Sequence, residues 1–151
     1  MVIILKNTEG DFENISPKEF LDFARELNQI KYNLNSTNAA VNRTVYMRIY
    51  YAVFLFLREW LKKFTNYKSK QGEHTKLPRF IKKYGPFGAD KNKEIYEELI
   101  HLKKLRHQAD YKLEIPQKNS LNYKNWEFTS IISAFEIAEG IIKTFNDFKS
   151  F

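Results

Sequence analysis

A short segment late in the chain, Leu-Arg-His-Gln-Ala-Asp-Tyr at positions 105–111, gathers the side chains best suited to chemistry. Arginine can stabilise a phosphate, while an imidazole, a carboxylate or a phenol can carry a proton. The segment therefore indicates either a surface cluster that stabilises a helix or a phosphate-handling site, whose catalytic candidates are Arg106, His107, Asp110 and Tyr111.

The spacing within this segment leaves both interpretations open. Arg106 and Asp110 lie four residues apart, so on a helix they share a face and can form an ion pair. Such a pair stabilises an exposed helix by about 0.3–0.5 kcal/mol. On that interpretation Tyr111 packs its ring and hydrogen-bonds its hydroxyl. On the other, Arg106 binds a polyanion or takes part in catalysis.

Charge gives a second indication. The 151 residues include 25 Lys and Arg against 18 Asp and Glu, a net charge of +7. Such an excess favours RNA or another polyanion as a partner, although it can serve solubility alone. It is concentrated between positions 65 and 90, at Lys68, Lys70, Lys76, Arg79, Lys82 and Lys83.

These basic residues alternate with Phe80 and Tyr84, a pattern typical of surfaces that bind single-stranded nucleic acid. A solvated loop is the alternative interpretation. Outside this segment, we count Lys103, Arg43 and Arg48 as further nucleic-acid-binding candidates.

Several kinds of chemistry are excluded or disfavoured. Cysteine is absent, so disulfides, thiol catalysis and thiolate metal sites are excluded. His74, His101 and His107 lack the spacing of metal ligands on a helix, and the glycines form no phosphate-binding loop. We therefore expect no metal and no cofactor. Residues 1–5 are apolar but too short for a membrane span or a signal-peptide core, so we expect a cytoplasmic protein.

The elements that must position these residues are helices. Apolar residues recur every three to four positions over about 17–31, 37–64, 91–111 and 123–148, which predicts four main helices. Ser16, Pro17 and Glu19 form a capping box at the first helix start. A short extra helix is predicted over 77–81, and residues 114–122 form a connector. We expect a single all-α domain over 1–151, an antiparallel bundle.

The helix predicted over 37–64 is apolar on more than one side, because Tyr50, Tyr51 and Phe54 widen its inner stripe. This width predicts burial by the core on one side and by a second copy of the chain on another, giving a homodimer. Arg48 lies beside this stripe and needs a partner, for which Asp110 is a candidate.

Two segments together resemble the HEPN superfamily of small helical bundles. Residues 48–54 are Arg-Ile-Tyr-Tyr-Ala-Val-Phe, similar to the pattern Arg-x-x-Tyr-Tyr-Ala-x-Phe with one residue fewer after the arginine. Residues 106–111 match the pattern Arg-x-x-Ala-Asp-Tyr. The resemblance extends over about 17–148. It implies a HEPN-like antiparallel bundle that dimerises through its long helix, and active members are metal-independent endoribonucleases.

The chain departs from the nuclease signature of that superfamily, in which a histidine follows an arginine after four to six residues. No arginine here has such a histidine, and positions 110–112 hold Asp, Tyr and Lys. Two functions therefore stay open. One is an RNA-directed protein of a toxin–antitoxin or defence module, either a ribonuclease with an unusual site or a degenerate RNA binder. The other is a non-catalytic partner of a minimal nucleotidyltransferase or another neighbour-encoded protein. A small-ligand binder is a third, weaker option.

Overall fold

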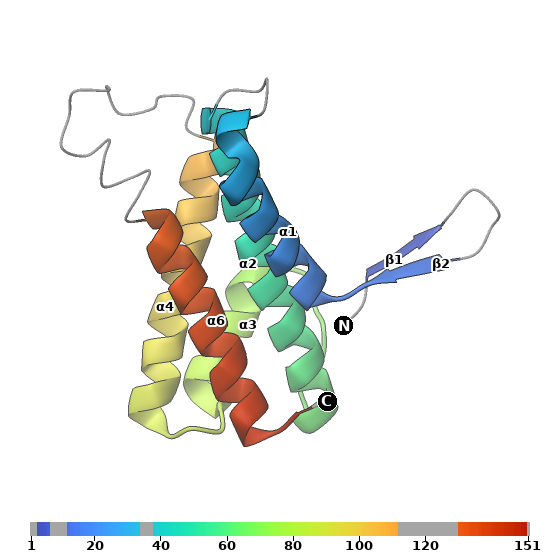
Figure 1. Ribbon diagram of the computed structural model, residues 1–151. Coiled ribbons are helices and arrows are strands. Elements are labelled where there is room, and N and C mark those ends of the chain that lie inside the picture. Colours follow the sequence, from blue (N-terminus) through green and yellow to red (C-terminus); the bar gives the residue numbers. More distant parts are fainter. Residues whose placement is uncertain (1–2, 7–11, 34–37, 112–129, 151) are drawn as a thin grey trace.

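The protein is a bundle of helices that run alternately up and down (Figure 1). The computed structural model describes residues 3–6, 12–33, 38–111 and 130–150. The long helices are α1 (Pro17–Ile30), α2 (Asn38–Phe64), α4 (Ala89–Tyr111) and α6 (Ser130–Phe148), and α3 (Glu73–Tyr84) is shorter. The predicted all-α antiparallel bundle is thereby confirmed.

Three elements differ from the sequence-based expectation. Strands β1 (Ile3–Lys6) and β2 (Phe12–Ile15) pair antiparallel, with Ile3 opposite Ile15, and project from the bundle (Figure 1). Such short strands carry too little periodicity to be recognised. The short helix predicted over 77–81 is also longer, spanning the whole of α3. The connector predicted over 114–122 and the first residues of the last predicted helix lie outside the described residues.

Helix α1 begins where its capping signals predict. The Ser16 side chain accepts a hydrogen bond from the Glu19 backbone, and the Glu19 carboxylate accepts one from the Ser16 backbone at 2.7 Å. These two bonds satisfy backbone donors that the first turn of a helix leaves unpaired. Pro17 occupies the first turn, where its missing N–H costs nothing.

Helix α2 is the central element, because α1, α4 and α6 all pack against it. The side chains from Ala52 to Leu57 are all buried within this single chain. The width of the apolar surface of α2 is thus accounted for by helices of its own chain. A homodimer through this helix stays a prediction that follows from the family resemblance rather than from uncovered apolar surface.

Aromatic side chains form the part of the core where the C-terminal halves of α2 and α6 pack together. Trp60 of α2 is buried against Phe145 of α6, with ring centroids 4.8 Å apart in an edge-to-face arrangement. The indole nitrogen donates a hydrogen bond of 2.8 Å to the Lys149 carbonyl. Large buried rings whose polar atom is hydrogen-bonded contribute strongly to stability. This cluster therefore fixes α6 against α2.

The turn between α3 and α4 is held by one buried polar side chain. Asn92 donates to the Gly85 carbonyl at 2.8 Å and accepts from the Phe87 backbone at 3.2 Å. A β-carbon at Gly85 would lie 2.5 Å from the Asn92 side-chain oxygen, so only glycine fits this close approach. The turn therefore fixes the orientation of α3 relative to α4, which the candidate site requires.

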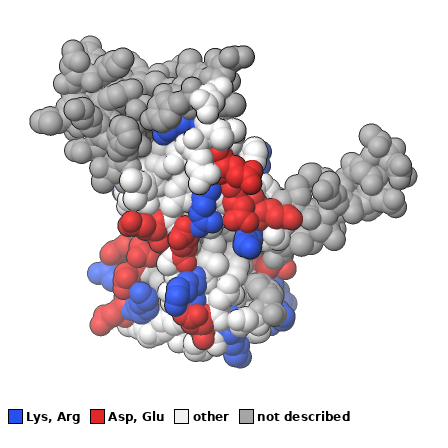
Figure 2. Space-filling model, in the orientation of Figure 1, with Lys and Arg blue, Asp and Glu red and all other residues white. Residues whose placement is uncertain are grey.

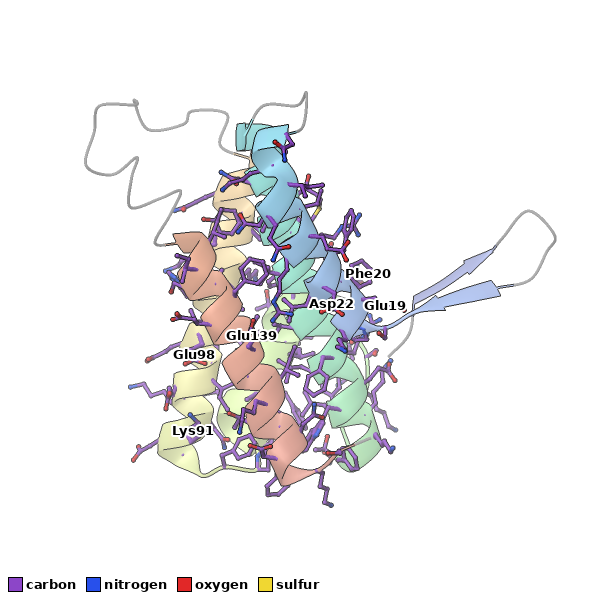
Figure 3. All side chains as sticks on the ribbon, in the orientation of Figure 1. Glu19, Phe20, Asp22, Lys91, Glu98 and Glu139 are labelled. Carbon is purple, nitrogen blue, oxygen red and sulfur yellow. The ribbon has the colours of Figure 1, made fainter. Side chains whose placement is uncertain are left out.

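Charge is unevenly distributed over the bundle. The face in Figure 2 carries acidic and basic side chains interspersed. Its acids include Glu19 and Asp22 on α1, Glu98 on α4 and Glu139 on α6 (Figure 3). By contrast, α3, which α6 partly hides in Figure 1, carries four lysines and arginines and one acid, Glu73. Within the part of the chain that the structure describes, none of the helices combines the length and apolar character of a membrane span.

Candidate functional site

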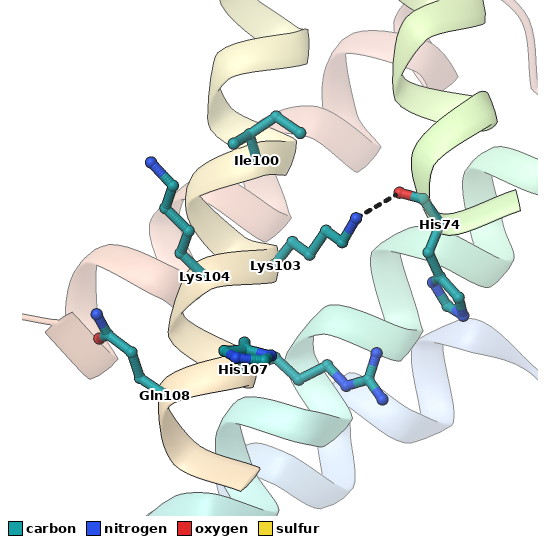
Figure 4. A pocket seen from close by; sticks show the side chains of 7 residues that line it. His74, Ile100, Lys103, Lys104, His107 and Gln108 are labelled. Atoms are coloured by element: carbon teal, nitrogen blue, oxygen red, sulfur yellow. Dashed lines mark hydrogen bonds between the residues drawn. The ribbon is translucent and has the colours of Figure 1, made fainter. Parts of the chain in front are cut away.

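A pocket of about 510 Å³ lies between α3 and the second half of α4 (Figure 4). We call it the Arg106 pocket. Its described lining is basic, apart from one apolar and one amide side chain, and consists of His74, Ile100, Lys103, Lys104, Arg106, His107 and Gln108. The structure thus brings together two of the predicted catalytic candidates, Arg106 and His107, with Lys103 from the predicted nucleic-acid-binding set.

Arg106 is held on an aromatic surface provided by α2. Its guanidinium carbon lies 5.2 Å from the ring centroid of Tyr50 and 4.9 Å from that of Tyr51. Cations over ring faces gain about 0.5–2 kcal/mol, more when water is excluded. Tyr50 is only 3% exposed, in agreement with the expectation that the aromatic stripe is buried. The arginine is therefore fixed in position, with its charge at the edge of the pocket.

The most informative contact of the site is one that the sequence does not indicate. His74, at the start of α3, stacks on Phe54 with ring centroids 4.3 Å apart, and its Nδ1 lies 2.7 Å from the Tyr50 hydroxyl. His74 and Tyr50 are 24 positions apart and on different helices. No periodicity links them, so only the packing of α3 reveals the pair.

The protonation states of this pair follow from burial. Burial raises the pKa of Tyr50 to about 12, although the charge of Arg106 and a hydrogen bond from it act in the opposite direction. Burial, followed by the charges of Arg106 and Lys103, lowers the pKa of His74 below its ordinary value. The phenol is thus protonated and the imidazole neutral near pH 7.

These states set the direction of the hydrogen bonds. Arginine only donates, so the Tyr50 oxygen accepts from Arg106 and its hydrogen is available for Nδ1 of His74. The neutral imidazole then carries its own proton on Nε2. The result is a connected chain from Arg106 through Tyr50 to His74, in which a cation, a phenol and a neutral imidazole are fixed relative to one another.

Lys103 is positioned by an irregularity in α3. Pro78 lies inside this helix and lacks the N–H that would bond to the carbonyl four residues earlier, that of His74. The Lys103 ammonium donates to that carbonyl at 3.3 Å (Figure 4). It also donates to the Thr75 hydroxyl at 3.4 Å. The proline therefore provides an acceptor that holds a second cation at the pocket.

The other predicted basic residues form a second concave surface. A groove of about 370 Å³ lies between residues 66–70 and α3, and we call it the α3 groove. Five of the predicted cations line it: Lys68, Lys70, Lys76, Arg79 and Lys83. Lys82 is not among them, since its ammonium lies over the ring of Tyr96 at 4.8 Å. Successive residues of a helix are rotated by about 100°, so Lys82 points away from the groove that Lys83 lines.

Arg43 and Arg48 lie apart from both concave surfaces, since neither is among the residues that line the Arg106 pocket or the α3 groove. Arg48 lies over the rings of Phe20 and Phe23 on α1, at 5.2 and 5.7 Å. It thus has an aromatic partner, and the contact joins α1 to α2. Whether Asp110 also reaches Arg48 falls outside the described side chains.

The remaining catalytic candidates are Asp110 and Tyr111, whose backbone belongs to the last turn of α4. Their side chains lie outside the described residues, so an ion pair of Asp110 with Arg106 stays a prediction. Among the side chains that are described, no group of three His, Asp or Glu residues gathers in a way that could hold a metal ion.

Fold and site together define a basic helical bundle with a cation-lined pocket between α3 and α4. Over 119 residues the chain is 33% identical to the uncharacterized protein MJ0628 of Methanocaldococcus jannaschii, a match that covers 68% of this chain and 67% of that protein. The chain belongs to the same family as this archaeal protein. No family model matches the chain, and no solved structure does.

Proposed function

We propose that the protein binds RNA and cleaves it at the Arg106 pocket, as a metal-independent endoribonuclease of HEPN type. One observation carries the proposal: Arg106, Lys103 and Lys104 converge on a single pocket beside two histidines, and no carboxylate is among its described lining residues. Such a lining attracts a phosphate diester, because cations neutralise its charge and imidazoles can move protons.

The contact between the two HEPN-like segments supports this proposal. Arg106, which opens the second segment, lies over the rings of Tyr50 and Tyr51, which belong to the first. The two patterns thus meet at one point of the bundle and include one of the pocket's cations. If the two segments matched the HEPN patterns only by chance, there would be no reason for them to be in contact in the fold.

The geometry suggests how cleavage would proceed. The imidazole of His107, one of the residues that line the pocket, accepts the proton of a ribose 2′-hydroxyl. The 2′-oxygen forms a bond to the adjacent phosphorus while the bond from phosphorus to the 5′-oxygen breaks, and the leaving 5′-oxygen takes up a proton from water. Arg106 stabilises the charge that develops on the phosphoryl oxygens. The products are a 2′,3′-cyclic phosphate and a 5′-hydroxyl end.

The test is cleavage of mixed cellular RNA in the presence of a metal chelator. We expect the unaltered protein to cleave and Arg106→Ala to be slower by about 100-fold or more, the effect of removing one donor to a developing oxyanion. Arg106→Lys retains a charge over the two rings and controls for folding. Lys93→Ala is the charge-matched control, since Lys93 lies on the same helix in an exposed pair with Glu97.

Two results would decide against the proposal. One is the absence of both cleavage and salt-sensitive RNA binding in the unaltered protein. The other is equal cleavage by the unaltered protein and both Arg106 variants, since the Arg106 pocket could then not be the site of reaction. An isolated complex with a neighbour-encoded nucleotidyltransferase, together with no RNA affinity, would support the non-catalytic alternative instead.

A further inference from the structure

The shape of the α3 groove is fixed by hydrogen bonds between buried or half-buried side chains. Tyr67 is buried at its base, and its hydroxyl donates to the Glu73 carboxylate at 3.0 Å. Glu73 also accepts from Arg58 of α2 at 3.2 Å. This trio ties residues 66–70 to the start of α3, so the groove has a defined shape.

The same trio removes the one acid of α3 from the electrostatics of the groove. Burial would raise the pKa of Glu73, but hydrogen bonds from Ser69, Tyr67 and Arg58 together lower it. Its charge is therefore present and neutralised by the Arg58 guanidinium. No acidic side chain is among the described residues that line the groove, whereas five cations are.

Three of these cations form a regular row. Lys76, Arg79 and Lys83 follow one another at three- and four-residue steps, so they share one face of α3. At about 1.5 Å of rise per residue, this row extends along the helix for about 10 Å. Lys68 and Lys70 face it from the other wall. Charges in two facing rows match a phosphate backbone lying along the groove.

An aromatic ladder runs beside the row. Tyr67 contacts Phe80 at 5.1 Å between centroids, and Phe80 contacts Tyr84 at 5.2 Å. Tyr84 is 59% exposed at the open end, and the Lys83 ammonium lies 5.1 Å from its ring centroid. Large rings are usually buried, and an exposed ring among cations offers a face on which a nucleobase can stack.

We infer that the α3 groove binds an unpaired stretch of nucleic acid, with phosphates on its cation rows and a base stacked on Tyr84. The inference rests on the proposed action on RNA and adds the class of substrate, single-stranded rather than duplex. In a duplex the bases are stacked on one another, so their faces cannot reach Tyr84. The Arg106 pocket lies on the other side of α3. A strand bound in the groove would continue around the helix and reach that pocket.

The experiment measures binding without chemistry. A fluorescent oligonucleotide of thymidines, which lacks the 2′-hydroxyl needed for cleavage, is titrated with the full chain, in parallel with a duplex of the same length. We expect Tyr84→Ala to weaken single-strand binding by about 5- to 150-fold, the range that corresponds to stacking of one base, and duplex binding by less than about twofold. Tyr84 is exposed, so this variant should fold normally.

A charge variant and a control complete the test. Lys76→Ala combined with Arg79→Ala should weaken the binding of both the single strand and the duplex. It should also reduce the slope of log affinity against log salt concentration by about two, which corresponds to the loss of two phosphate contacts. Lys93→Ala on α4 should change neither. The inference is overturned if the unaltered chain binds no oligonucleotide, if Tyr84→Ala changes single-strand affinity by less than twofold, or if duplex binding falls equally.

These outcomes separate the groove from the proposed catalysis. Arg106→Ala should slow RNA cleavage by about 100-fold or more, but weaken thymidine binding by no more than the loss of about one phosphate contact. Binding that depends on Tyr84 in a chain that cleaves no RNA would support the groove and contradict the nuclease proposal. Cleavage that depends on Arg106, with thymidine affinity independent of Tyr84, would do the reverse.

Discussion

The Arg106 pocket and the α3 groove are both basic and share helix α3, yet they hold their charges differently. In the pocket, a half-buried guanidinium rests on two rings and belongs to a hydrogen-bonded chain that ends at His74. In the groove, all five cations are exposed and extend into solvent. The pocket depends on the position of a few groups, and the groove depends on the number of its charges.

This difference has consequences for how each region responds to change. Removing one member of a buried network leaves its partners without hydrogen bonds, so effects are large and not additive. Exposed charges are screened by salt and act nearly independently, so each contributes little. The comparison can therefore be tested with matched substitutions, one in the pocket and one in the groove.

The largest contrast should come from two tyrosines. Tyr50→Ala removes a buried ring that packs on Phe54, so we expect a loss of about 3–5 kcal/mol in the free energy of unfolding. Tyr84→Ala removes an exposed ring and should change stability by less than about 0.5 kcal/mol. Urea unfolding followed by circular dichroism measures both. Similar losses would show that the groove is as integral to the core as the pocket.

A smaller effect isolates the hydroxyl of Tyr50. Tyr50→Phe leaves Nδ1 of His74 without its donor, which should cost about 1–3 kcal/mol, whereas Tyr84→Phe should cost almost nothing. Replacing His74 by Phe as well removes both polar partners. The double variant should then lose less stability than the sum of the two single variants. Strict additivity would mean that the two side chains do not interact.

The smallest expected effect is a dependence on pH. Burial, with Arg106 and Lys103, lowers the pKa of His74 in the folded state. Below about pH 6.5 the unfolded chain therefore takes up a proton that the folded chain does not, and stability falls as the pH decreases. His74→Gln should make the decline between pH 7 and pH 5 less steep, as measured by thermal unfolding.

Features of the chain that depend on near neighbours could be predicted from the sequence. The capping box at Ser16 and the uninterrupted apolar stripe of α2 place their helices within a residue or two. The convergence of Lys76, Arg79 and Lys83 follows from their spacing alone. Their groove also needs residues 66–70, which the buried Tyr67 and Glu73 hold in place.

Features that depend on tertiary packing could not be predicted. The partnership of His74 with Tyr50 requires α3 to lie against α2, and that placement comes from the Asn92 turn and the packing of α3 on α4. The structure extends the helix predicted over 77–81 at both ends, to Glu73–Tyr84. The Gly72 backbone, at φ 78°, allows the helix to begin well before its interior proline.

Pro78 places helix stability and anion binding in opposition at a single position. An ordinary residue there would return the His74 carbonyl to the internal bonding of α3 and strengthen the helix. The same change would compete with Lys103 for that carbonyl and weaken one of the two hydrogen bonds that hold its ammonium. Selection for a more stable fold and selection for a preorganised pocket would thus favour different residues at position 78, a trade-off common at functional sites.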